Sequence, residues 1–133
     1  MTQILTVDDD HIMLVILKTV LTKEGYHVTQ VKNGKEAIAL KDRFAFDLVI
    51  CDLMMPYANG YEVLSSFRND PVTANTPIII LSSIGNTATI EEVLSLGANE
   101  FISKPFTSAD LLGKIKTLLN TREHTNISLH EQR

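Results

Sequence analysis

Acidic, hydroxyl and amine side chains follow short apolar segments at four places in the sequence. The run Asp8 to Asp10 follows the first, and Asp52, Ser82 and Lys104 follow later ones. Two carboxylates about 4 Å apart repel by roughly 4 kcal/mol at the effective dielectric of a partly buried site, so a shared site would need a cation. Oxygen ligands without nearby His or Cys favour a hard divalent ion, and Mg²⁺ in particular.

The segments that must position these side chains show two patterns of apolar residues in turn. Short continuous apolar runs, typical of strands, alternate with segments whose apolar residues recur at helical spacing. This alternation indicates an α/β fold with a mostly parallel sheet. Strands are predicted over residues 3–7, 26–31, 46–51, 77–81 and 99–102. Helices are predicted around residues 13–21, 35–44, 61–67, 87–96 and 108–119. The third and fourth strands are unbroken apolar runs, so helices should cover both of their faces and these strands should be central.

Helix ends can also be predicted. Asp10 should cap the first helix, and Gly25 should end it in a left-handed conformation. Asn86 or Thr87 should cap the fourth helix, and Thr107 or Ser108 the fifth. Residues 121–133 are polar and aperiodic and are predicted to be a frayed tail or the start of a linker.

In an open parallel sheet, ligands bind at the carboxyl ends of the strands. We therefore predict that the acidic run Asp8 to Asp10 meets Asp52, Ser82 and Lys104 at one edge of the sheet. The second strand ends without such a group, which fits a position away from the site. Lys104 can pair with a carboxylate or with a phosphoryl oxygen.

Composition narrows the class of protein. The chain has 133 residues, of which 44% are hydrophobic and 21% charged, so one globular domain over residues 1–120 is expected. The formal net charge is −4 and the basic residues do not cluster, which argues against direct nucleic-acid binding. Cys51 is the single cysteine, so no internal disulfide forms. The longest apolar run, Ile12 to Leu17, is too short to cross a membrane, and no basic leader is present. A cytoplasmic protein without membrane contact is expected.

Four motifs together carry a family resemblance. They are Val7-Asp8-Asp9, Asp52 to Pro56 followed by Asn59-Gly60, Pro77 to Ser82, and Lys104-Pro105-Phe106. Each is weak alone, but in this order and spacing the chain resembles the receiver domain of response regulators, the CheY-like phosphoacceptor half of two-component systems. The resemblance implies a flavodoxin-like (βα)5 fold with strand order 2-1-3-4-5.

The resemblance also implies a site. Asp52 would be the phosphoacceptor, and Mg²⁺ would be held by Asp8, Asp9, Asp52 and the backbone carbonyl of Met54. Lys104 and Ser82 would contact the phosphoryl group.

Switch and lifetime residues follow from the same resemblance. Ser82 would move on phosphorylation together with Phe101, although Phe101 in a strand is equally compatible with plain core packing. The two positions that tune hydrolysis in the family correspond to Met54 and Ile84, both apolar here. Slow self-dephosphorylation is therefore expected.

The function expected from this resemblance is signalling. The chain would accept a phosphoryl group from a sensor histidine kinase or a histidine phosphotransfer protein. It would catalyse its own phosphorylation and dephosphorylation without turning over an external substrate. Output would pass through the fourth helix, fifth strand and fifth helix to a downstream protein, with the chain a monomer or a phosphorylation-dependent homodimer. A stand-alone receiver and a fragment of a larger regulator both fit the sequence.

Two other classes share parts of the pattern. A phosphatase of the haloacid-dehalogenase type would use Asp8 as nucleophile and Asp10 as acid/base, but the chain leaves little room for a substrate cap. A flavodoxin-like cofactor binder would need a hydroxyl- and glycine-rich phosphate loop after the first strand, where the acidic run would instead repel phosphate.

Overall fold

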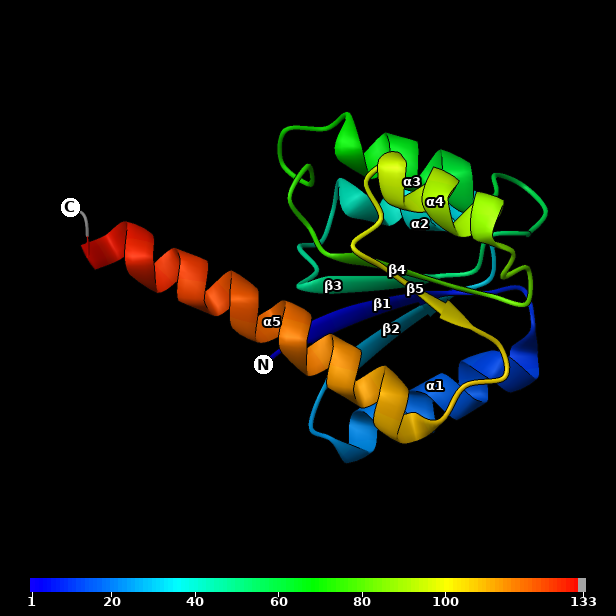
Figure 1. The fold of residues 1–133 in the computed structure, drawn as a ribbon, viewed down its shortest axis with the longest axis horizontal. Helices are drawn as coiled ribbons and strands as arrows, with labels where there is room; N and C mark the ends of the chain where they lie inside the picture. Colours follow the sequence, from blue (N-terminus) through cyan, green and yellow to red (C-terminus); the bar gives the residue numbers. More distant parts are fainter. Residues whose placement is uncertain (132–133) are drawn as a thin grey trace.

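The chain forms one parallel sheet of five strands between two layers of helices (Figure 1). A computed structural model describes the backbone of residues 1–131 and the side chains of residues 1–121. In chain order the elements are β1 (Gln3–Val7), α1 (His11–Lys23), β2 (His27–Val31), α2 (Gly34–Lys41), β3 (Leu48–Cys51), α3 (Gly60–Arg68), β4 (Ile78–Ser82), α4 (Thr87–Ser95), β5 (Glu100–Ser103) and α5 (Ser108–Glu131). The predicted α/β class and number of strands are confirmed.

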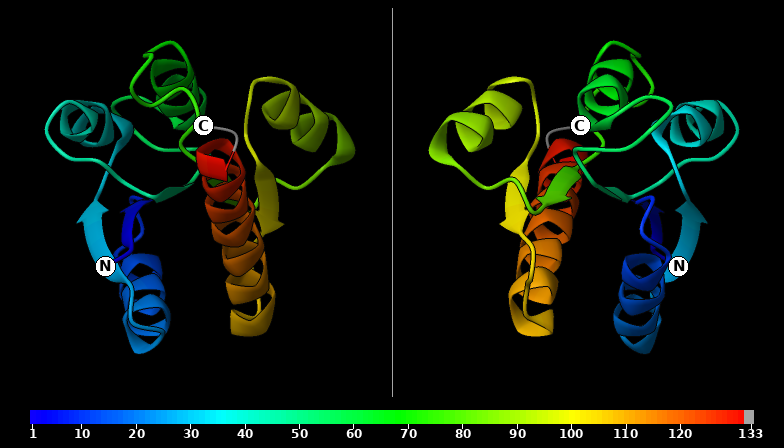
Figure 2. Two further views of the ribbon diagram at one scale, coloured as in Figure 1. Left: turned by 90° about the vertical axis from the view of Figure 1, so that its left-hand side faces the viewer. Right: turned by 90° about the vertical axis from the view of Figure 1, so that its right-hand side faces the viewer.

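The strand order is β2-β1-β3-β4-β5, with all neighbours parallel. This confirms the predicted order 2-1-3-4-5. Every residue of β3 and β4 is buried, as their unbroken apolar runs predict, whereas β2 at the edge is mostly half-exposed. Helices α1 and α5 cover one face of the sheet, and α2, α3 and α4 cover the other (Figures 1 and 2).

Side-chain alternation along the strands builds two cores. In β1, Ile4 packs with Leu17 of α1 and Ile115 of α5. Leu5, one residue on, points to the opposite face and packs with Val63 of α3. Because all five strands run parallel, their carboxyl ends gather at a single edge, called here the carboxyl edge of the sheet.

Asparagine and aspartate side chains begin most of the helices. Asp10 caps α1 through a 3.0 Å hydrogen bond from the Ile12 amide, and Gly25 follows with φ +89°, both as predicted. Asn86 rather than Thr87 caps α4. Thr107, just before α5, caps that helix: its hydroxyl oxygen accepts the Asp110 amide at 3.1 Å.

Two helix ends differ from the sequence-based expectation. Helix α2 stops at Lys41 instead of Phe44, and the Arg43 amide bonds to the Leu40 carbonyl three residues back, as in the tightened last turn of a helix. Helix α5 continues to Glu131 and runs beyond the sheet (Figure 1), whereas the sequence pattern predicts helix only to about residue 119 and a frayed tail or the start of a linker over residues 121–133. The sequence has no glycine or proline after Gly113 that would stop it. Within the described residues, none of the helices has the length and apolar character needed to cross a bilayer.

Candidate functional site

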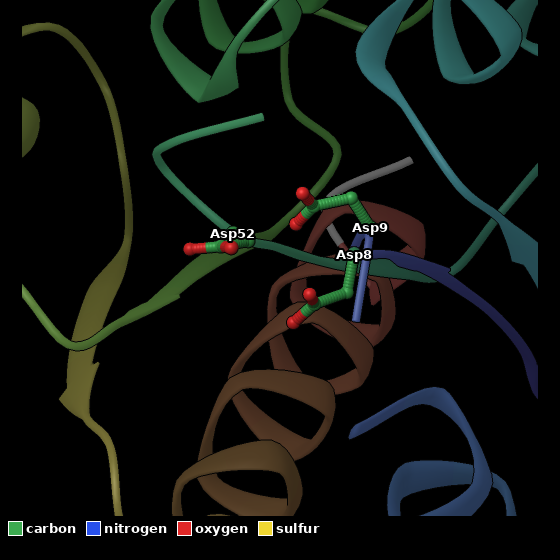
Figure 3. A group of neighbouring side chains, drawn as sticks. All are labelled: Asp8, Asp9 and Asp52. Atoms are coloured by element: carbon green, nitrogen blue, oxygen red, sulfur yellow. The ribbon is translucent and has the colours of Figure 1, made fainter. Parts of the chain in front are cut away.

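Three aspartates meet at the carboxyl edge of the sheet. Asp8 and Asp9 follow β1, and Asp52 follows β3 (Figure 3). One carboxylate oxygen from each lies within 4.8 Å of the others. Segments more than 40 residues apart thus bring three acidic groups to one place, as the strand-end pattern predicts.

Backbone hydrogen bonds of the sheet fix these positions. The Asp52 amide donates to the Val7 carbonyl at 2.9 Å, and the Asp8 amide donates to the Val31 carbonyl at 3.2 Å. The Lys104 amide likewise donates to the Ser82 carbonyl at 2.9 Å. Each site residue is therefore held by the strand ladder one residue beyond its own strand.

Lys104 supplies the positive charge among the acids. Its Nζ lies 2.8 Å from Asp8 Oδ2 and 3.5 Å from Asp52 Oδ2. Asp8 is 1% exposed and Asp52 8%, whereas Asp9 is exposed. The buried pair Asp8 and Asp52 thus shares one ammonium group, while Asp9 lies at the solvent side.

The electrostatics of Asp52 are unbalanced. Burial raises the pKa of Asp52 above its ordinary value. Lys104 opposes this rise, the charge of Asp8 adds to it, and hydrogen bonds from the Leu53 and Met54 amides oppose it further. The folded chain therefore holds the ionised form of Asp52 less favourably than water does.

Lys104 remains a cation in this setting. Burial alone would lower the pKa of Lys104, but the hydrogen bond to Asp8 and the charges of Asp52 and Asp8 together raise it. The Lys104-Pro105 peptide bond is cis.

The two predicted switch residues lie on neighbouring strands. Ser82 is the last residue of β4 and is 1% exposed, and its hydroxyl oxygen accepts the Ile84 amide at 3.2 Å. Phe101 lies in β5, is 9% exposed and packs in the core beneath α2, α3 and α4. In this structure the Phe101 ring is thus part of the core, a position compatible both with the predicted switch role and with plain packing.

Met54 lies in the loop between β3 and α3, next to the acids. Its side chain is 54% exposed, and its amide hydrogen bonds to the Asp52 carboxylate. Ile84, the other apolar position predicted to matter for hydrolysis, is 37% exposed.

Asp10 is not available as an acid/base partner of Asp8. Its carboxylate caps α1, and its amide donates to Asp8 Oδ1 at 2.9 Å. The Asp8 carboxylate is itself buried against Lys104. Both carboxylates that a phosphatase of the haloacid-dehalogenase type would need, those of Asp8 and Asp10, are therefore engaged in structural contacts in this chain.

The residues present fit a hard divalent cation. Three carboxylates converge, of which those of Asp8 and Asp52 are buried, and the ammonium group of Lys104 cannot neutralise all three charges. Oxygen-only donors of this kind are typical of Mg²⁺ sites that retain bound water. Such an arrangement can bind a cation and bring a phosphoryl group to the acid between the cation and Lys104.

Comparisons with known proteins agree with this geometry. The sequence model for the response regulator receiver domain matches residues 4–116. The transcriptional regulatory protein CpxR of Klebsiella pneumoniae is 37% identical over 124 residues, which are 93% of this chain and 51% of that protein. The chain thus spans about half the length of this curated relative.

Solved structures extend the likeness to three dimensions. A CheY-like response regulator receiver domain protein from Methanospirillum hungatei superimposes with a TM-score of 0.88 at 30% identity, covering 94% of this chain and 98% of that one. The receiver domain of the sensor histidine kinase PA1611 from Pseudomonas aeruginosa superimposes with a TM-score of 0.84 at 27% identity, covering 90% and 98%. That structure is described as holding a magnesium ion in its active-site cleft.

Proposed function

This chain belongs to the response regulator receiver domain family of two-component systems, and we propose that Asp52 is the residue that accepts its phosphoryl group. The observation that carries the proposal is the convergence of Asp8, Asp9 and Asp52 with Lys104 at the carboxyl edge of the sheet. Asp52 follows β3, a central strand of the sheet, and its Oδ2 lies 3.5 Å from Lys104 Nζ.

The reaction is a phosphoryl transfer in which Asp52 is the nucleophile. A carboxylate oxygen of Asp52 forms a bond to phosphorus while the phosphorus–nitrogen bond of a phosphohistidine breaks. The bonding electron pair returns to the imidazole, and the product is an acyl phosphate. Positioning and charge neutralisation supply most of the rate in such transfers.

Each side chain has a distinct part in this step. Lys104, whose Nζ lies 3.5 Å from Asp52 Oδ2, would neutralise charge on the phosphoryl oxygens, and the Ser82 hydroxyl would donate to one of them. Asp8, Asp9, Asp52 and the Met54 carbonyl would hold Mg²⁺. When bound, the ion supplies further positive charge at the transferring group.

The proposed output surface is formed by α4, β5 and α5. An acyl phosphate adds about 1.5–2 negative charges at Asp52. Ser82 would then give up its bond to the Ile84 amide, and the loop that leads into α4 would move with it. Phe101 lies in β5 beside this loop and is proposed to follow. A downstream protein or a second copy would bind the altered surface.

The proposed donor is a sensor histidine kinase or a histidine phosphotransfer protein in the cytoplasm. The chain would catalyse its own phosphorylation and dephosphorylation and would not turn over an external substrate. No direct nucleic-acid contact is proposed for residues 1–121, because their basic side chains do not form a cluster.

The assignment of Asp52 can be tested with a small phosphodonor. We expect the protein, mixed with acetyl phosphate and Mg²⁺, to gain the mass of one phosphoryl group. Borohydride reduction followed by peptide mapping should place the group on Asp52, and excess EDTA should prevent the gain. A phosphoryl group on another residue would refute the assignment. Repeated release of phosphate from simple phosphate esters would instead show a phosphatase.

The acyl phosphate is predicted to be long-lived. Met54 and Ile84 are both partly exposed and apolar, so neither can orient a water molecule for attack on the phosphorus. Introducing a polar group by Met54→Asn or Ile84→Glu should accelerate loss of phosphate by roughly tenfold or more, since a positioned acid/base group contributes about 10²–10⁴-fold. The decay can be followed by intact mass after the donor is removed. Native decay as fast as that of both variants would contradict the prediction.

A further inference from the structure

The loop that follows Asp52 is fastened at both of its ends. This β3–α3 loop comprises residues 53–59 and carries the exposed Met54. At its base the Gly60 amide donates to the Leu53 carbonyl at 2.8 Å. The amides of Leu53 and Met54 also donate to the Asp52 carboxylate. The first part of the loop is therefore tied directly to the site.

The far part of the loop is tied to a different element, the start of α2. The Gly34 amide donates to the Ala58 carbonyl at 3.0 Å, and the Lys35 amide donates to the Tyr57 carbonyl at 2.9 Å. These are amides of the first helical turn, which have no partner inside the helix. The two bonds join segments more than 20 residues apart in the sequence.

The residues that supply those carbonyls have an unfavourable backbone. Tyr57 has φ 52° and Ala58 has φ 72°, which is the left-handed region that costs a non-glycine residue roughly 1–2 kcal/mol. Such a conformation persists only where surrounding contacts impose it. The two hydrogen bonds from the start of α2 are contacts of this kind.

Gly34 is required by the loop and not by its own helix. A Cβ at position 34 would overlap the Ala58 carbonyl oxygen and lie 2.8 Å from the Ala58 carbonyl carbon and from Val63 Cγ2. Gly34 has no left-handed backbone angle, so alanine could adopt its conformation. The obstacle to a side chain at position 34 is thus its contact with the loop and α3.

We propose that Gly34 is a positioning residue for the cation site: by allowing α2 to hold Tyr57 and Ala58, it sets where the β3–α3 loop presents the Met54 backbone to Asp52. The inference rests on the proposed function, in which the Met54 carbonyl is a ligand of Mg²⁺. Gly34 touches neither the ion nor the phosphoryl group and acts through the loop alone.

The Gly34→Ala variant tests this inference. The new methyl group must displace the Ala58 carbonyl, and the loop should shift. The Mg²⁺ dissociation constant should rise about 10- to 100-fold, the usual effect of losing the outer support of a metal ligand. In the metal-free protein, the amide NMR signals of Met54 and Gly60 should move, although both are remote from residue 34 in sequence.

Gly113→Ala provides a matched control. Gly113 lies in α5, and a Cβ there would meet nothing within 4 Å. This variant should bind Mg²⁺ as the native chain does. A folded Gly34→Ala protein whose Mg²⁺ affinity stays within twofold of the native value would overturn the inference. Failure of the native chain to bind Mg²⁺ or to be modified on Asp52 would instead overturn the proposed function.

A measurement on the native chain covers the case in which Gly34→Ala does not fold. Coupling between two sites is reciprocal, so if α2 positions the loop for the ion, the ion must stabilise the contact with α2. Saturating Mg²⁺ should therefore slow hydrogen exchange of the Gly34 and Lys35 amides by about tenfold relative to amides of α5. Equal protection of α2 and α5 by Mg²⁺ would overturn the proposal.

Discussion

The Asp52→Asn variant should accept no phosphoryl group, yet in metal-free buffer it should melt at a higher temperature than the native chain. The first effect follows because an amide oxygen cannot replace the carboxylate nucleophile. The second follows because burial and the charge of Asp8 raise the pKa of Asp52, so the folded state holds that ionised group unfavourably. Asparagine keeps the shape of the side chain and removes the charge, while Lys104 retains Asp8 at 2.8 Å.

The gain is expected to be about 1 kcal/mol, as is common when an unfavourable charge is removed. For a domain of this size it corresponds to a rise of about 3–5 °C in melting temperature. Circular dichroism in EDTA would measure it. Asp42→Asn, which removes an exposed charge beside Lys41, is the control and should give no rise.

Added Mg²⁺ should reverse the order of the two melting temperatures, so that the native chain melts above Asp52→Asn. A ligand that binds only the folded state raises its stability, and the native site has the full set of carboxylates. The native chain should therefore gain stability with added Mg²⁺, whereas Asp52→Asn should gain little. A variant that melts below the native chain in EDTA would show that ionised Asp52 stabilises the fold, contrary to this argument.

The meeting of the acidic side chains and Lys104 was predictable because it depends on a pattern that recurs along the sequence. Asp8, Asp52, Ser82 and Lys104 each end an apolar run, and parallel strands all end at one edge. The edge position of β2 is consistent with the lack of a functional group at its end. The fold class required only the alternation of the two periodicities.

Contacts between distant segments could not be predicted in the same way. The contact between Gly34 and Ala58 depends on how the start of α2 packs against the loop before α3, which the sequence pattern does not specify. The end of α2 was missed because the apolar pattern continues to Phe44, whereas the helix ends at Lys41. The length of α5 was not predicted because residues 121–131 are polar and lack the apolar periodicity by which a helix is recognised in a sequence.

Arg68 illustrates the same limit at the opposite edge of the sheet. A single arginine at a helix end is ordinarily a solvated residue. Here its Nε donates to the Gly97 carbonyl at 2.9 Å, one Nη to the Thr76 carbonyl at 2.8 Å and the other Nη to Asn99 Oδ1 at 2.8 Å. The same Asn99 oxygen accepts the amide of Ile78, the first residue of β4. Arg68 therefore joins α3 to the residues just before β4 and β5.

Replacing Arg68 with methionine should destabilise the fold by about 2–4 kcal/mol. Methionine keeps much of the side-chain volume but donates no hydrogen bond, so the acceptors at Gly97, Thr76 and Asn99 lose a charged donor that contributes about 1.5–3 kcal/mol per bond. Burial lowers the pKa of Arg68, so part of this gain is offset in the native chain by the cost of burying the guanidinium. Urea unfolding at pH 7 would measure the net loss.

Two further variants distinguish the hydrogen-bond geometry of Arg68 from its positive charge, and both from the general effect of replacing an arginine with methionine. Arg68→Lys keeps the charge but has a single ammonium group, which cannot span three acceptors, so it should lose at least half as much stability as Arg68→Met. Arg43→Met removes an exposed arginine and should change stability by less than about 0.5 kcal/mol. Mg²⁺ affinity of folded Arg68→Met should stay within twofold of native, since Arg68 bonds to the amino ends of β4 and β5 and the acids lie at the carboxyl edge. Should Arg68→Lys prove as stable as the native chain, the positive charge alone would account for the role of Arg68, and the three-way hydrogen bonding would not.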